Sequence, residues 1–172
     1  MCPGAPNRAE SGEPRFTLDG HLGTLARLLR TLGYDTSWRH PIDDSVLIEE
    51  AGEEGRILIT RDTRLVKRRG LGRHLLIASN DPEEQLLEVI RGCGLRPDPD
   101  LWFTRCLVCN LPIEKISREA AAPCVPPFVL STKQDFTRCP GCRRVYWEGT
   151  HSQRMRDRIS AILSKATDET QD

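Results

Sequence analysis

The sequence lacks an excess of charge of either sign and lacks any long apolar run. Lysine plus arginine total 25, as do aspartate plus glutamate, so the formal net charge at pH 7 is zero. No overall field therefore attracts the chain to nucleic acid or to a membrane, and we expect electrostatic recognition to be local. No segment approaches the roughly 20 apolar residues of a membrane span, and residues 1–14 lack the apolar run of a signal peptide. We therefore expect no membrane partner, and the sequence indicates no oligomeric state.

The apolar content is also modest. Of the 172 residues, 38% are hydrophobic and 29% are charged. These values favour a small core together with a second domain that is stabilised in another way, rather than one large core. Four of the seven cysteines form two CxxC pairs, which in a reducing compartment are typical of metal ligands rather than of disulfides. We expect a cytoplasmic protein.

Residues 1–14 are polar and are expected to be disordered, whereas residues 15–95 alternate between strand and helix patterns. Strands are expected at residues 15–18, 34–39, 57–59 and 75–77. Helices are expected at residues 22–32, from Asp43 and Asp44 to Gly55, over a short basic segment that ends at Gly70, and from Asp81 and Pro82 to Gly92. Such alternation predicts a compact α/β domain with a parallel sheet covered by helices.

Residues 96–158 have a different composition, with both CxxC pairs, several prolines and most of the aromatic residues. Residues 96–100 are predicted to be a linker, and a short basic helix is expected over residues 155–163. Residues 159–172 are assigned to a polar C-terminal tail.

The two CxxC pairs predict one structural metal ion. Each pair can present two sulfur atoms from a single turn, and zinc is bound by four such ligands in a tetrahedron. A redox role is disfavoured because there are two pairs, and iron is the alternative metal. The predicted zinc ligands are Cys106, Cys109, Cys139 and Cys142.

Acidic residues follow several predicted strands. Asp19 and Asp62 lie just beyond two strand ends, Asp43 and Asp44 begin the helix after another, and Asp81 has a similar place. The carboxyl ends of parallel strands share one edge, where such sheets build their sites. Clustered carboxylates suit Mg²⁺ or Mn²⁺, which can activate water for phosphodiester cleavage. Each aspartate also has a simpler interpretation as a helix cap or a turn residue.

A basic stretch follows Asp62. Its side chains are predicted to contact phosphates next to the scissile bond, beside the acidic residues, although the face of a solvated helix is the alternative. The residues concerned are Arg61, Arg64, Lys67, Arg68 and Arg69.

Several short motifs occur in order over residues 15–158. They include Leu18-Asp19-Gly20, Gly33-Tyr34-Asp35, Thr60-Arg61-Asp62, Ser79-Asn80-Asp81-Pro82 and the two CxxC pairs. In this order the motifs resemble the Mut-seven C-terminal ribonuclease family, a PIN-like nuclease domain joined to a zinc ribbon.

The resemblance implies an α/β fold with a PIN-like parallel sheet flanked by helices at residues 15–95, followed by a small zinc-ribbon domain with four cysteine ligands at residues 96–158. It implies a metal-dependent ribonuclease, with RNA as the substrate and Asp19, Asp44 or Asp43, and Asp62 holding Mg²⁺ or Mn²⁺. Asp81 lies where a fourth acidic residue is plausible. A non-catalytic RNA-binding or adaptor module is the main alternative, and a phosphoryl-transfer receiver domain is a weaker one.

Overall fold

The computed structural model describes residues 13–168. The disorder expected for residues 1–14 therefore falls almost entirely outside the described residues. The chain divides into two compact units, Met1–Phe103 and Thr104–Asp172, which we call the first and the second unit.

The first unit contains the predicted parallel sheet. The four strands are β1 (Phe16–Leu18), β2 (Thr36–Trp38), β3 (Ile57–Thr60) and β4 (His74–Leu76), and their order across the sheet is β2-β1-β3-β4. All three strand pairs are parallel. The α/β fold with a parallel sheet is thus confirmed.

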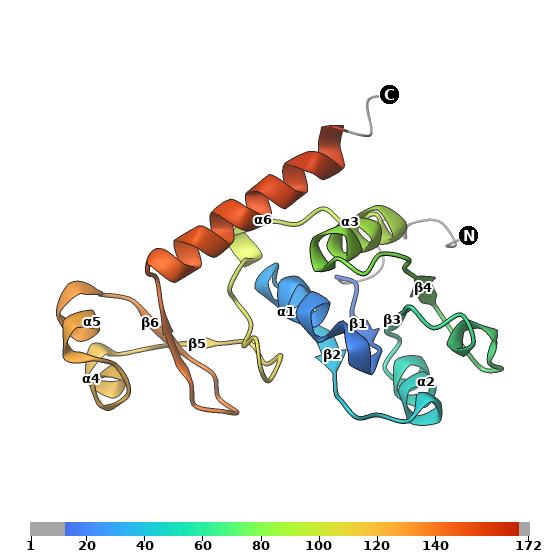
Figure 1. Ribbon diagram of the computed structural model, residues 1–172. Helices are drawn as coiled ribbons and strands as arrows, with labels where there is room; N and C mark the ends of the chain where they lie inside the picture. Colours follow the sequence, from blue (N-terminus) through green and yellow to red (C-terminus); the bar gives the residue numbers. More distant parts are fainter. Residues whose placement is uncertain (1–12, 169–172) are drawn as a thin grey trace. The chain divides into compact units, whose positions relative to one another are not determined.

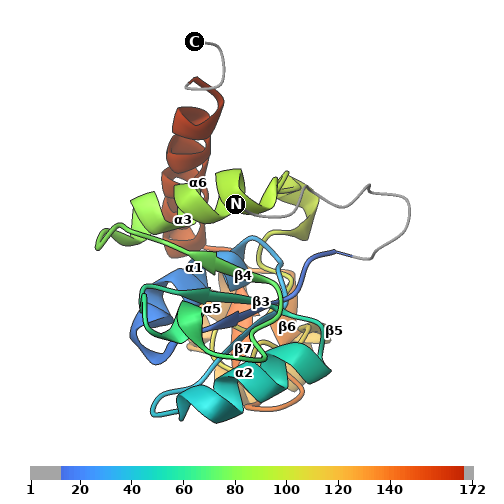
Figure 2. The same ribbon diagram turned by 90° about the vertical axis from the view of Figure 1, so that its right-hand side faces the viewer.

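Helices cover both faces of this sheet. They are α1 (Gly23–Thr31), α2 (Asp44–Glu53) and α3 (Pro82–Cys93), and α1 contacts α3 whereas α2 contacts β1 and β3. The chain runs one way across the sheet from β1 to β2 and then back over β1 to β3. Because parallel crossovers are right-handed, this reversal places α1 and α2 on opposite faces. Figures 1 and 2 show the arrangement, with α2 and α3 on opposite sides of the strands.

The apolar residues of these elements explain why they pack. In α1, Leu25, Leu28 and Leu29 recur at helical spacing and are buried, and Leu58 and Ile59 of β3 are fully buried. On the α2 side, one cluster joins the buried Leu47, Ala51, Leu58 and Leu65. A fully buried leucine contributes roughly 1.5–3 kcal/mol relative to exposure, so this small set holds the sheet between its helices.

Two segments of the first unit differ from the sequence predictions. The basic segment before Gly70 contains only a single 3₁₀ turn, Leu65–Lys67, rather than a helix. Residues 96–103, which were expected to begin the second domain, belong to the first unit. Their attachment is direct, since the Phe103 N–H donates to the Thr31 carbonyl at the end of α1 (2.8 Å).

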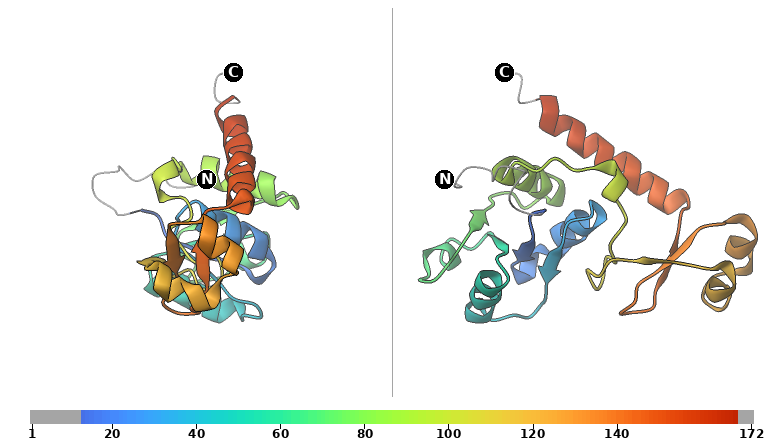
Figure 3. Two further views of the ribbon diagram at one scale, coloured as in Figure 1. Left: turned by 90° about the vertical axis from the view of Figure 1, so that its left-hand side faces the viewer. Right: turned by 180° about the vertical axis from the view of Figure 1, so that it is seen from behind.

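The second unit is built on an antiparallel sheet. Its strands β5 (Glu114–Ile116), β6 (Phe136–Arg138) and β7 (Val145–Trp147) lie in that order. Two short helices, α4 (Arg118–Ala121) and α5 (Pro127–Thr132), lie together at one end of this sheet (Figure 3). A small core of Ala121, Val125 and Phe136 joins them to the strands.

The described part of the chain finishes with a long helix, α6 (Thr150–Asp168). It is longer than the predicted helix over residues 155–163 and includes most of the segment assigned to a polar tail. The reason is apolar burial, because Ile159 and Ile162 are buried within that segment. Among residues 13–168, no helix has the length and apolar content that a membrane crossing requires.

Candidate functional site

The strand order of the first unit reverses between β1 and β3, and we use the word crevice for the carboxyl-end edge of the sheet at this reversal. These strands are neighbours, but the chain leaves β1 toward β2 and leaves β3 toward β4, on the other side of the sheet. Ligands of open α/β sheets bind at such a reversal of strand order, outside the carboxyl ends of the strands. Asp19 follows β1 and Asp62 lies two residues after β3, so both flank this crevice.

Thr60 links the two aspartates. Its buried hydroxyl donates to Asp19 Oδ2 and accepts from the Asp62 N–H, with both distances 2.9 Å. The Asp62 carboxylate accepts in turn from the Arg64 N–H through Oδ1 (2.6 Å). Asp19 is half-buried and Asp62 is exposed, so the crevice combines an oriented carboxylate with one open to solvent.

Asp43 and Asp44 have different roles at the start of α2. Asp43 caps the helix, because its Oδ1 accepts from the Ser45 N–H (2.8 Å), and this hydrogen bond lowers the pKa of Asp43. Asp44 is the first residue of the helix and pairs with Arg68 at 3.3 Å. Of the two, Asp44 is thus the carboxylate that does not cap.

Asp81 is the N-cap of α3. Its Oδ1 accepts from the N–H groups of Glu83 (2.9 Å) and Glu84 (3.1 Å). Sequence reasoning missed Glu88, which lies two turns further along α3 and accepts from the N–H groups of Ala78 (2.7 Å) and Ser79 (2.8 Å). Glu88 thereby holds the loop after β4, and no pattern in the sequence signals this role.

The aspartates do not form a preassembled cage. Within residues 13–168, no three of the carboxylates offer oxygen atoms that all lie within 4.8 Å of one another. This does not argue against Mg²⁺, which commonly binds through one or two carboxylates and keeps several waters. Asp19 and Asp62, linked through Thr60, suit such an open site.

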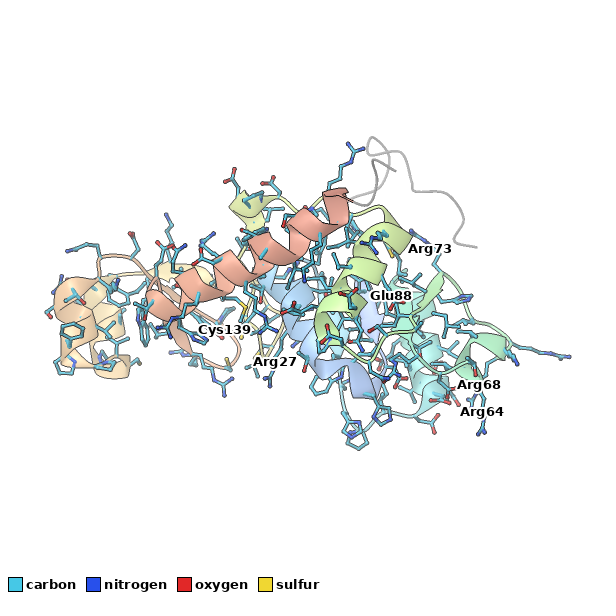
Figure 4. The ribbon with its side chains drawn as sticks, turned by 45° about the horizontal axis from the view of Figure 1, so that its top comes forward. Arg27, Arg64, Arg68, Arg73, Glu88 and Cys139 are labelled. Carbon is cyan, nitrogen blue, oxygen red and sulfur yellow. The ribbon has the colours of Figure 1, made fainter. Side chains whose placement is uncertain are left out.

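The predicted phosphate-contacting residues lie on the loop after β3, which a buried leucine anchors to the core. Leu65 is buried in the α2 cluster, whereas the side chains of Arg61, Arg64, Lys67, Arg68 and Arg69 are exposed. Figure 4 shows Arg64 and Arg68 on this loop. Because Arg68 also pairs with Asp44, it has a structural partner within the chain.

Two histidines beside Asp19 were also missed. The rings of His21 and His40 have centroids 5.8 Å apart. Gly20 lies directly against the His40 ring, since a Cβ atom there would be 2.6 Å from His40 Nδ1. Trp38 donates from Nε1 to the Gly20 carbonyl (3.0 Å) and so fixes the turn that carries Asp19.

The second unit contains the predicted metal centre. The sulfur atoms of Cys106, Cys109, Cys139 and Cys142 all lie within 4.8 Å of one another. The Sγ atoms of Cys106 and Cys142 are 3.7 Å apart, and tetrahedral geometry with Zn–S bonds of about 2.3 Å requires a separation of about 3.8 Å. The four side chains therefore suit a zinc ion, and Cys139 is labelled in Figure 4.

The two cysteine turns share one backbone pattern. In the first, the Cys106 N–H donates to the Leu111 carbonyl and the Asn110 N–H donates to the Cys106 carbonyl. Cys139 is bonded in the same way, to the Arg144 carbonyl and from the Arg143 N–H. Asn110 and Arg143 both have positive φ, 66° and 64°. A positive φ is uncommon for residues other than glycine. Asparagine adopts it more often than most, so Asn110 was the only one of the two whose residue type indicated this conformation.

Tyr146 of β7 contacts the cluster of four cysteines. Its hydroxyl lies 3.1 Å from Cys106 Sγ, and the Cys109 N–H donates to the same sulfur (3.3 Å). Burial alone would raise the pKa of the Cys106 thiol, but hydrogen bonds from Tyr146 and from the backbone outweigh it and lower this pKa to about 6. Burial raises the pKa of Tyr146, so its hydroxyl keeps the proton that it donates.

Comparison with known proteins identifies the family. No curated protein and no solved structure matches the chain. A family model described as the Mut7-C RNAse domain matches residues 14–159, which cover most of each unit and include all the predicted aspartate, basic and cysteine site residues. The chain belongs to the Mut7-C RNAse domain family.

Proposed function

We propose that the protein is a ribonuclease that depends on Mg²⁺ or Mn²⁺ and hydrolyses phosphodiester bonds within RNA. Membership of an RNase domain family indicates a nuclease-type function. The observation that carries the proposal is the pair Asp19 and Asp62, linked through Thr60 at the crevice between β1 and β3. A PIN-like identity for the sheet and a zinc-ribbon identity for the second unit belong to the same proposal.

In this proposal each residue of the crevice has a role. Asp19 and Asp62 would hold the divalent ion, and Thr60 fixes the orientation of the Asp19 carboxylate. When bound, the ion would supply an activated water and stabilise the charge that develops on the phosphate. Asp44 contributes a further carboxylate ligand when the Arg68 side chain leaves it to bind a phosphate of the RNA. Asp43 and Asp81 cap their helices and so position them.

The basic loop would guide the substrate. Arg61, Arg64, Lys67, Arg68 and Arg69 are exposed immediately after the strand that carries Thr60, so they can contact phosphates next to the scissile bond. Four thiols in a metal site suit a reducing compartment, and we propose the cytoplasm.

The test is cleavage of labelled single-stranded RNA by the purified chain with Mg²⁺ or Mn²⁺. Asp62→Asn keeps the size and the turn of Asp62 but removes the charge that binds the cation, so activity should be lost while the fold is kept. Asp81→Asn is the matched control, because asparagine caps a helix about as well as aspartate. Equal cleavage by wild type and Asp62→Asn would show that this crevice is not catalytic.

A second candidate function is a non-catalytic RNA-binding adaptor. It is favoured by one observation, namely that within the described residues only the four cysteines form a preassembled group of metal ligands. RNA binding without cleavage, with and without Mn²⁺, would support it.

A further inference from the structure

Helix α6 displays a line of basic side chains. His151, Arg154, Arg158 and Lys165 are all exposed. Their spacing of three, four and seven residues places them within an arc of roughly 60° on the helix surface, over a length of about 21 Å. We call these four residues the α6 basic stripe.

The orientation of this stripe is set by burial. Ile159 and Ile162 are 0% and 1% exposed, and Met155 beside them is half-buried. These apolar residues occupy a neighbouring arc of the same helix. Because that arc is buried, α6 cannot roll to hide the basic side chains.

The stripe carries charge of one sign. Asp157 is the only carboxylate in residues 150–166; it lies one turn from Arg154, outside the arc of the stripe, and its Oδ1 accepts from Gln153 Nε2 (2.9 Å). Glu148, just before the helix, lies 3.6 Å from Arg156, which is outside the stripe. In a chain with no net charge, this is a local concentration of positive charge.

An exposed aromatic residue lies at the start of the same helix. Trp147 ends β7 and is 36% exposed. Its indole lies against Gly149, where a Cβ atom would be 3.6 Å from Trp147 Nε1. Gly149 immediately precedes α6, so the ring lies near the first turn of the helix that carries the stripe.

We propose that Trp147 and the α6 basic stripe of the second unit bind single-stranded RNA, in addition to the contacts proposed for the first unit around Asp19 and Asp62. Proteins that bind single strands without sequence preference combine a basic track for the phosphates with aromatic rings on which bases stack. The apolar side of α6 is buried, so the helix has no apolar face to insert into a lipid surface, which favours RNA over a membrane. This inference rests on the proposed function, since it assumes RNA as the ligand.

The test measures binding without cleavage. The full chain with Asp62→Asn is titrated in EDTA against a fluorescein-labelled single-stranded RNA at several KCl concentrations, and binding is followed by anisotropy. Adding Arg154→Ala and Arg158→Ala should weaken binding about tenfold. It should also reduce the slope of log K against log salt by about 1.4, because each of the two lost phosphate contacts contributes about 0.7 to that slope. RNA should also quench tryptophan fluorescence, and Trp147→Phe should remove most of that quenching.

The control removes the same charge from the same unit. Lys115 of β5 and Arg118 of α4 are both exposed, and the double variant Lys115→Ala with Arg118→Ala should leave affinity and salt slope nearly unchanged. Circular dichroism and zinc content verify that all variants are folded. The proposal would be overturned if both double variants weakened RNA binding equally, or if the α6 variant left RNA binding unchanged. Binding of the chain to phosphatidylserine vesicles but not to RNA would also overturn it.

The outcomes also separate this proposal from the ribonuclease proposal. RNA binding that depends on the stripe, without cleavage by the wild type, would uphold the stripe and refute the enzyme. Metal-dependent cleavage with unchanged RNA binding by the α6 variant would refute the stripe alone.

Discussion

Replacing Thr60 by valine removes one buried hydroxyl group and keeps the β-branched shape that suits a strand. In the structure this hydroxyl makes two hydrogen bonds, one to the Asp19 carboxylate and one from the Asp62 N–H. The substitution therefore tests whether the two aspartates act as one unit, without touching either of them.

The magnitude follows from these two bonds. A hydrogen bond to a charged group contributes about 1.5–3 kcal/mol and a neutral one about 0.5–1.5 kcal/mol. Asp62 is exposed and Asp19 is half-buried, so water replaces part of what is lost. We expect Thr60→Val to lower the free energy of unfolding by about 1–3 kcal/mol.

Urea unfolding of the full chain measures this loss, and the RNA cleavage assay measures its effect on the crevice. Thr60→Ser is the control, because it keeps the hydroxyl and loses one methyl group, worth about 0.8 kcal/mol. Thr60→Val should lose most of its activity, whereas Thr60→Ser should retain it. If Thr60→Val matches the wild type in both stability and cleavage, the link between Asp19 and Asp62 is unimportant.

The metal centre yields two further predictions. Elemental analysis should find one zinc per chain, and Cys139→Ser should abolish it and unfold the second unit, because the folding free energy of such a unit includes that of metal binding. Amide spectra should then lose the signals of residues 104–168 but keep those of the first unit, and an ordered second unit without zinc would contradict a structural role. Tyr146→Phe removes the hydroxyl beside Cys106 Sγ and should weaken zinc binding roughly 10- to 100-fold in competition with a chromophoric chelator.

Local patterns determined much of the first unit. Apolar runs at residues 57–59 and leucines at helical spacing in α1 fix strand and helix by burial, and these signals need only neighbouring residues. The cap at Asp81 was likewise readable, because the N-cap, the following proline and the glutamate all lie within four residues. The spacing of the CxxC pairs predicted for the same reason that these four cysteines could share one metal ion, and the structure brings their sulfur atoms together.

Other features depend on contacts between distant parts of the chain, and only the tertiary structure decided them. The order β2-β1-β3-β4 brings Asp19 and Asp62 to one crevice, and Thr60 joins them through a hydroxyl 41 residues from Asp19. The contact between Tyr146 and Cys106 spans 40 residues. The sequence by itself determined which residue types line the strand ends and the cysteine turns. Their partners were set by packing, because a hydroxyl or a carboxylate has no preferred partner until the fold brings one within reach.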